Sequence, residues 1–163
     1  MAKFFEPPLD AVELVEQVIG KWHHHLLEAD IGVLFRDVAQ KSGPTTVMGQ
    51  AKKVSPDMQA AGCEFDFILI FAEDVWETLT PEQKEALVDH ECCHCLYDGE
   101  KVKLRPHDFE EFNEVIERHG LWWPGAQETA RVIQGHTMPL FGRQGRVAAV
   151  SDSSASVVLG EGD

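Results

Sequence analysis

One short segment of the chain has the residue types and spacing that metal-dependent hydrolysis requires. His90 and His94 stand four residues apart, and Glu91 directly follows the first of them. Residues four apart on a helix project from nearly the same side, so both imidazoles can bind one Zn²⁺. From its position on the same helix, the Glu91 carboxylate can reach a zinc-activated water without binding the metal. The pattern therefore predicts two metal ligands and a general base.

A catalytic zinc site needs a third protein ligand, and the sequence offers more than one candidate. The nearest downstream histidine is His107, and the residues between it and His94 are enough for a loop and a turn back to the first helix. The rivals are carboxylates of the next predicted helix, namely Glu110, Glu111 and Glu114. Ligand chemistry favours His107, and a carboxylate remains the alternative.

The helix that carries the motif has a clear beginning. Thr80 suits the N-cap, Pro81 suits the first helical position, and Gln83 completes a capping box, so we expect a helix from 81 to 95 or 96. Most of its circumference is apolar. A buried helix with two histidines and a glutamate on inner faces needs a reason, because unpaired polar burial costs several kcal/mol. A bound metal supplies that reason, and the cysteines of this helix are expected to act as small buried fillers.

The remaining pattern predicts an α+β fold. An amphipathic helix is expected over residues 9–28, followed by strands over 31–38, 45–54 and 64–72. A further helix is expected from a capping box at Asp108 to about His119, and another within 121–141. We expect one domain over residues 1–141, with a small, mostly antiparallel sheet of about three strands packed on the N-terminal helix and the motif helix. Residues 142–163 have no usable period and are predicted to be a flexible tail.

Charge and composition exclude several classes of protein. The 14 basic and 28 acidic residues give a net charge of −14, and residues 64–117 hold sixteen acids against four bases. Such a chain is repelled by phosphate backbones, so direct nucleic-acid binding is not expected. No stretch approaches the roughly 18 apolar residues of a membrane span, and no secretion signal is visible. Four cysteines, three of them within four residues, indicate reduced thiols and a cytoplasmic location.

The segment from about Glu64 to Gly120 resembles small zinc-metallopeptidase domains of the SprT and Wss1 type, and resembles bacteriophage metallopeptidases more closely. The matching features are an apolar strand, the segment from His90 to His94 with a cysteine before the second histidine, and His107 followed by Phe109 and Phe112. The resemblance implies a minimal zincin in which His90, His94 and His107 hold zinc and Glu91 is the base. If the chain is phage-encoded, its location would be the host cytoplasm.

Two functions from different classes follow. The first is a zinc-dependent metallopeptidase that cleaves a protein or peptide substrate lying extended along a sheet edge. The second is an acidic protein-binding or polyanion-mimic module whose zinc is structural. The glutamate at position 91 favours the peptidase, because a purely structural site has no need of an acid next to its first ligand. The oligomeric state is not predicted.

Overall fold

The structure is a computed structural model of the 163-residue chain. It describes residues 1–108, 110, 112–121 and 125–137. The chain divides into two compact units, Met1–His107 and Asp108–Asp163, and each is described by itself. The predicted tail lies outside the described residues, so the domain limit at residue 141 stays a prediction.

The first unit is built on a four-stranded mixed sheet in the order β1-β2-β6-β5. β2 (Ile31–Arg36) runs parallel to β6 (Phe67–Ala72), while β1 (Phe4–Phe5) and β5 (Gly49–Lys53) flank them in antiparallel pairings. The α+β class is as predicted, and the sheet differs in two ways from the one expected. Its central pairing is parallel, because the long connection between β2 and β6 leaves room for a crossover. It also gains β1, a strand too short to show any periodicity.

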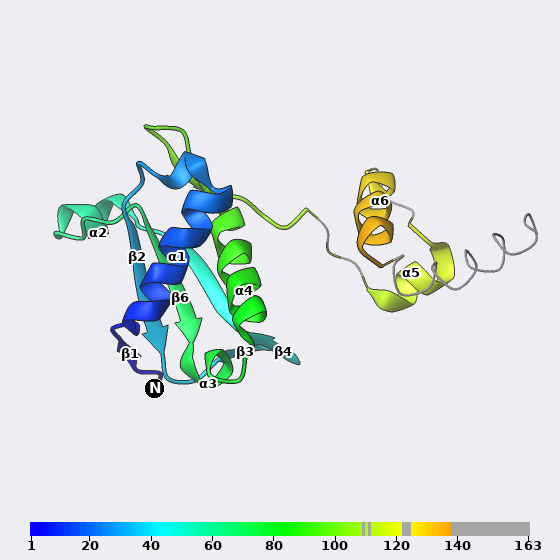
Figure 1. The fold of residues 1–163 in the computed structure, drawn as a ribbon, viewed down its shortest axis with the longest axis horizontal. Coiled ribbons are helices and arrows are strands. Elements are labelled where there is room, and N and C mark those ends of the chain that lie inside the picture. Colours follow the sequence, from blue (N-terminus) through cyan, green and yellow to red (C-terminus); the bar gives the residue numbers. More distant parts are fainter. Residues whose placement is uncertain (109, 111, 122–124, 138–163) are drawn as a thin grey trace, which may run out of the picture. The chain divides into compact units, whose positions relative to one another are not determined.

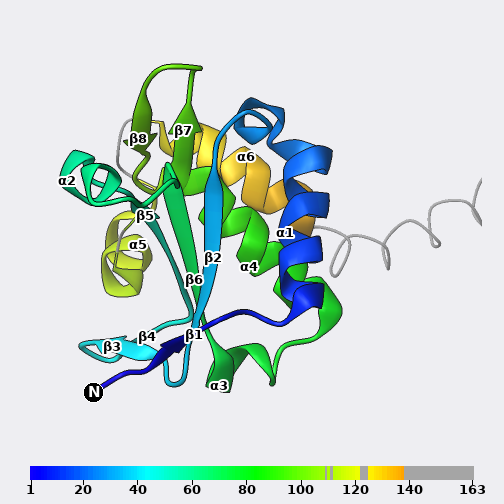
Figure 2. The ribbon, with the colours of Figure 1, turned by 90° about the vertical axis from the view of Figure 1, so that its left-hand side faces the viewer.

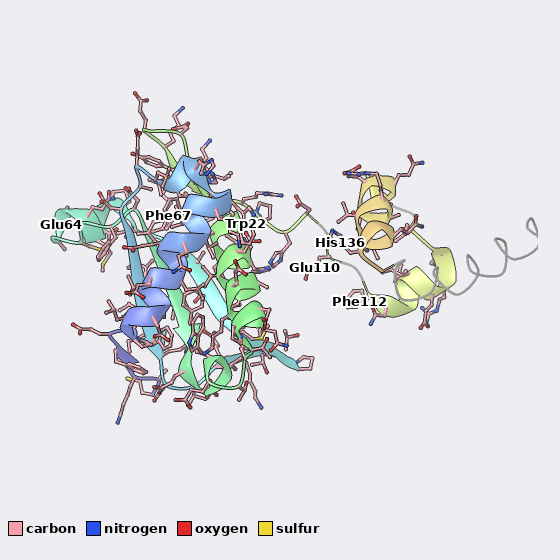
Figure 3. The ribbon with its side chains drawn as sticks, viewed as in Figure 1. Trp22, Glu64, Phe67, Glu110, Phe112 and His136 are labelled. Atoms are coloured by element: carbon pink, nitrogen blue, oxygen red, sulfur yellow. The ribbon has the colours of Figure 1, made fainter. Side chains whose placement is uncertain are left out.

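Two helices, α1 (Leu9–Trp22) and α4 (Pro81–His94), lie side by side on one face of this sheet (Figure 1 and Figure 2). The core forms where they meet the sheet, and it contains Val15, Val18, Phe35, Phe67, Leu69, Phe71, Val88 and Cys92. The capping box at Thr80 and Gln83 is confirmed. The first helix ends earlier than expected, at Trp22, and continues as a short 3-10 turn, η1 (His24–Leu26). Trp22 itself is half exposed at the end of α1 (Figure 3).

Short elements fill the connections of the first unit. β3 (Gln40–Ser42) and β4 (Thr45–Val47) form a hairpin, so the strand expected over 45–54 is interrupted at Met48 and resumes as β5. α2 (Pro56–Ala60) lies in the connection between β5 and β6, and α3 (Glu73–Trp76) follows β6. A second hairpin, β7 (Cys95–Tyr97) and β8 (Val102–Leu104), directly follows α4.

The second unit contains α5 (Asn113–His119) and α6 (Ala126–Thr137). The prediction that a helix begins at a cap on Asp108 is wrong, because the N-cap of α5 is Phe112, whose backbone is extended. Figure 3 marks Phe112 and His136 in this unit. In the described part of the chain, no helix combines the length and apolar character needed to cross a membrane.

Candidate metal centre

α4 and the hairpin after it bring three histidines together. His90 and His94 lie one turn apart near the end of α4, and β7 starts at the residue after His94. The register of the hairpin pairs Cys95 with Leu104, so the returning strand ends beside the place where the helix stopped. Three residues later the chain reaches His107. The hairpin therefore explains how a distant histidine returns to the motif helix.

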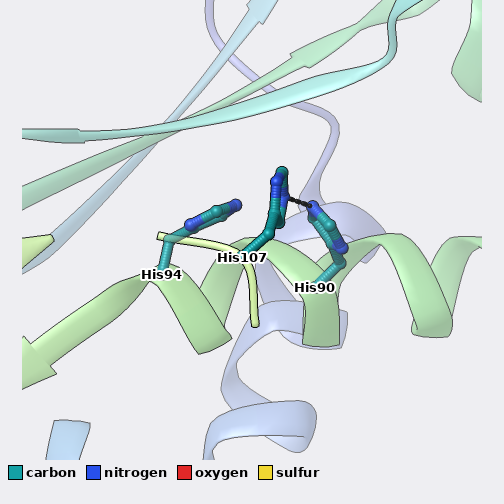
Figure 4. Close-up of side chains that lie close together, drawn as sticks. All are labelled: His90, His94 and His107. Atoms are coloured by element: carbon teal, nitrogen blue, oxygen red, sulfur yellow. Dashed lines mark hydrogen bonds between the residues drawn. The ribbon is translucent and has the colours of Figure 1, made fainter. Parts of the chain in front are cut away.

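The three imidazoles face a common point (Figure 4). Their ligand nitrogens all lie within 4.8 Å of one another, and the Nε2 atoms of His90 and His107 are 3.1 Å apart. At Zn–N distances of about 2.0–2.1 Å, two nitrogens of a tetrahedral site lie roughly 3.3 Å apart. The spacing and the donor type therefore fit a three-histidine zinc site of the kind that keeps a fourth position open.

Backbone contacts orient His94 and fix the segment that carries His107. The Nδ1 atom of His94 donates to the carbonyl oxygen of Arg105 at 2.6 Å, and the Arg105 amide donates to the carbonyl oxygen of His94 at 2.7 Å. A proton on Nδ1 leaves Nε2 as the metal-binding nitrogen. The same reciprocal pair holds the chain two residues before His107 against the end of α4.

Glu91 lines the same cavity as the three histidines. This cavity measures about 180 Å³, and its walls are Gly49, Gln50, Ala51, His90, Glu91, His94, Leu104 and His107. The Glu91 side chain is only 4% exposed and packs against β5, where Gly49 offers no side chain. Burial raises the pKa of Glu91, while nearby His94 and backbone hydrogen bonding with Ala51 act in the opposite direction. A carboxyl group of raised pKa beside the histidines suits proton transfer.

The surroundings of His90 favour its neutral, metal-binding form. Burial lowers the pKa of His90, and neighbouring His94 and His107 lower it further. Neutral imidazole is the form that binds a metal ion. Two nearby thiols are unsuited to such a role, because burial raises the pKa of Cys92 on α4 and raises that of Cys95 on β7 to about 12. Both side chains are fully buried, as expected for small core fillers, whereas Cys93 is exposed and contradicts that expectation.

The three consecutive histidines after α1, His23, His24 and His25, each have a different contact partner. His23 is buried and its Nε2 lies 2.6 Å from an Asp89 carboxylate oxygen, which links α1 to α4. His24 and His25 contact the carbonyl oxygens of Gly20 and Cys95. His23, Asp89 and Cys93 have ligand atoms within 4.8 Å of one another. The short distance between His23 and Asp89 is that of a hydrogen bond, so we interpret this group as a packing contact.

The choice between His107 and the rival carboxylates stays a prediction. Glu110 belongs to the second unit, Glu111 lies outside the described residues, and the side chain of Glu114 is not described. The sequence did not reveal the parts of the structure that hold the histidines and Glu91 in place. These are the β7–β8 hairpin, the Arg105 backbone and Gly49. The Asp98-Gly99 pair was a visible turn signal for that hairpin, whereas nothing in the sequence joins Gly49 to Glu91.

Comparisons with known proteins place the chain in a family. Comparisons with curated proteins and with solved structures give no match. A family described as "Putative phage metallopeptidase" matches residues 2–135, which is most of the chain. With a histidine trio able to hold a metal and this family match, the chain has the features of a metal-dependent peptidase. The protein therefore belongs to the phage metallopeptidase family.

Proposed function

We propose that this protein is a zinc-dependent peptidase in which His90, His94 and His107 bind the metal and Glu91 is the general base. The supporting observation is that one cavity is lined both by the three imidazoles and by a buried carboxylate of raised pKa. The minimal zincin architecture and the likeness to SprT- and Wss1-type domains are part of this proposal. The location that fits its buried, protonated thiols is cytoplasmic.

Zinc held by the three imidazoles would supply Lewis-acid activation of a water molecule and of the substrate carbonyl. The chain's own task is to move one proton. Glu91 takes the proton from the attacking water as its oxygen adds to the carbonyl carbon, and returns it to the amide nitrogen as the C–N bond breaks. Because burial raises the pKa of Glu91, its carboxylate can hold that proton between the two steps.

The substrate in this proposal is an extended segment of a protein. β5 is an edge strand of the sheet, and its residues Gly49, Gln50 and Ala51 line the cavity that holds the histidines. An edge strand offers backbone groups to which an extended peptide can pair. We propose that the scissile peptide lies along β5, which would bring its carbonyl group to the histidine trio.

The test separates metal binding from catalysis. His90→Ala, His94→Ala and His107→Ala should each lose stoichiometric zinc, whereas His24→Ala, which changes an exposed histidine of η1, should keep it. Glu91→Gln should keep the zinc and lose cleavage of an unstructured protein by about 10²–10⁴-fold. Full zinc retention in any of the three ligand variants would refute the ligand set. Cleavage at the parent rate by Glu91→Gln would remove Glu91 from the mechanism.

A further inference from the structure

A second, larger cavity adjoins the metal centre. It measures about 540 Å³ and shares Gly49, His90, Glu91 and His107 with the cavity described above. The rest of its wall comes from β4 and the residue after it on one side, and from the chain around the first three turns of α4 on the other. These lining residues are Thr45, Thr46, Val47, Met48, Leu79, Gln83, Ala86 and Leu87.

The wall of this second cavity carries no charge outside the residues it shares with the metal centre. That is unusual surface for a chain with a net charge of −14. Val47 and Met48 face the cavity from the β4 side, and Leu79, Ala86 and Leu87 line it from the α4 side. The Gln83 side-chain oxygen is engaged in the capping box of α4, where it accepts the Thr80 amide at 3.0 Å. An apolar group can enter without displacing charged side chains, whereas a charged group would meet no oppositely charged side chain in this part of the wall.

The position of the cavity limits what can occupy it. Its shared residues include two of the proposed zinc ligands and the proposed base, so its occupant lies directly beside the bond that is cut. A peptide held along β5 places a side chain near that bond. Met48, which is 44% exposed at the point where β4 leads into β5, adds a flexible apolar side chain to the wall.

We propose that this cavity binds a large apolar side chain of the peptide substrate, adjacent to the scissile bond, and so sets the cleavage specificity. The inference rests on the proposed zinc peptidase function, and it narrows the substrate class to segments that expose residues such as leucine or phenylalanine. Those side chains are buried in folded proteins, so the enzyme would select unfolded or extended chains.

The test measures binding, which does not require turnover. Two series of peptide hydroxamates would be titrated calorimetrically into the zinc-loaded protein, one with the variable side chain on each side of the zinc-binding group. The variable side chain would be alanine, leucine, phenylalanine or aspartate. In one of the two series, leucine and phenylalanine should bind at least about tenfold more tightly than alanine, since a single methylene in an apolar pocket is worth about 10–200-fold. Aspartate should bind more weakly than alanine.

Substitution of the wall provides the matched control. Ala86→Phe fills the cavity from α4 and should abolish the preference for large side chains while zinc stoichiometry and alanine-hydroxamate binding persist. Ala86→Leu, a smaller change, should reduce that preference and serves if the larger variant fails to fold. Ala60→Phe, at an exposed position of α2, should leave the preference unchanged.

Two failures are distinguishable. If the alanine hydroxamate binds but affinity is the same for every side chain in both series, the cavity is not a specificity site and this inference is overturned while the zinc site stands. If no hydroxamate binds the zinc-loaded protein, the proposed centre itself fails, and the inference falls with it.

Discussion

Gly49→Ala tests whether β5 holds the Glu91 carboxylate in its working position. A Cβ atom at residue 49 would lie 2.7 Å from Glu91 Oε1 and 3.1 Å from both Cδ and Cγ. Ordinary contact begins at 3.4 Å, so the carboxylate oxygen must move by the difference, 3.4 minus 2.7, or about 0.7 Å. Glu91 is only 4% exposed and cannot simply swing into solvent.

A displacement of this size is large on the scale of catalysis. A misplacement of about 1 Å can cost about 10²-fold in rate, so we expect Gly49→Ala to lower kcat by about 10–100-fold. The three atoms nearest to the added Cβ all belong to Glu91, which is the proposed base and not a proposed ligand, so zinc stoichiometry should stay at the parent value. Gly20→Ala is the matched control, because nothing lies within 4 Å of the added Cβ on α1.

A double-mutant cycle distinguishes positioning from general damage. If Gly49 acts only through Glu91, then Gly49→Ala should cause no further loss in a Glu91→Gln background. Steady-state kinetics on one unstructured protein substrate would give all four rates, and thermal melting would verify folding. A folded Gly49→Ala protein with kcat within about twofold of the parent would refute the reasoning. Multiplicative losses in the double variant would show that Gly49 acts by another route.

Three further predictions concern stability and metal affinity. Thr80→Ala removes the side-chain acceptor of the Gln83 amide and should cost about 1 kcal/mol of unfolding free energy in chemical denaturation. Asp98→Ala removes the acceptor of the Glu100 and Lys101 amides in the β7–β8 turn; by loosening the hairpin that leads to His107, it should weaken zinc binding in chelator competition without removing a ligand. In the metal-free protein, burial raises the pKa of Glu91, so the folded state favours the protonated carboxyl group. The resulting stabilisation of the folded state is fully present below the ordinary glutamate pKa of 4.5 and is lost as pH rises through the folded-state pKa. Glu91→Gln should therefore raise the melting temperature more at about pH 8 than at about pH 4, and an equal shift at both would contradict this.

The sequence predicted the helix that carries the site better than the elements around it, because the signals for that helix are local. The spacing of His90 and His94 and the cap at Thr80 are local signals, and the structure has both on α4. Strand β6 was also visible, because its apolar run is buried as a run of that type should be. By contrast, the helix expected from Asp108 begins only at Asn113, since a capping pattern states a preference that the surrounding chain can override.

The parts that remained hidden depend on contacts between distant residues. Gly49 approaches Glu91 across 42 positions of sequence, counted as 91 minus 49, and Arg105 meets His94 only because a hairpin has closed between them. Neither the hydrophobic periodicity of a segment nor a short motif can indicate such long-range contacts, since they form only when separate elements pack together. In the proposed mechanism, two ligands and the base lie on one helix, whereas the position of the base depends on β5 and that of the third ligand on the β7–β8 hairpin. Variants in these two supports should therefore alter rate and metal affinity separately: β5 acts on the base, and the hairpin acts on the third histidine.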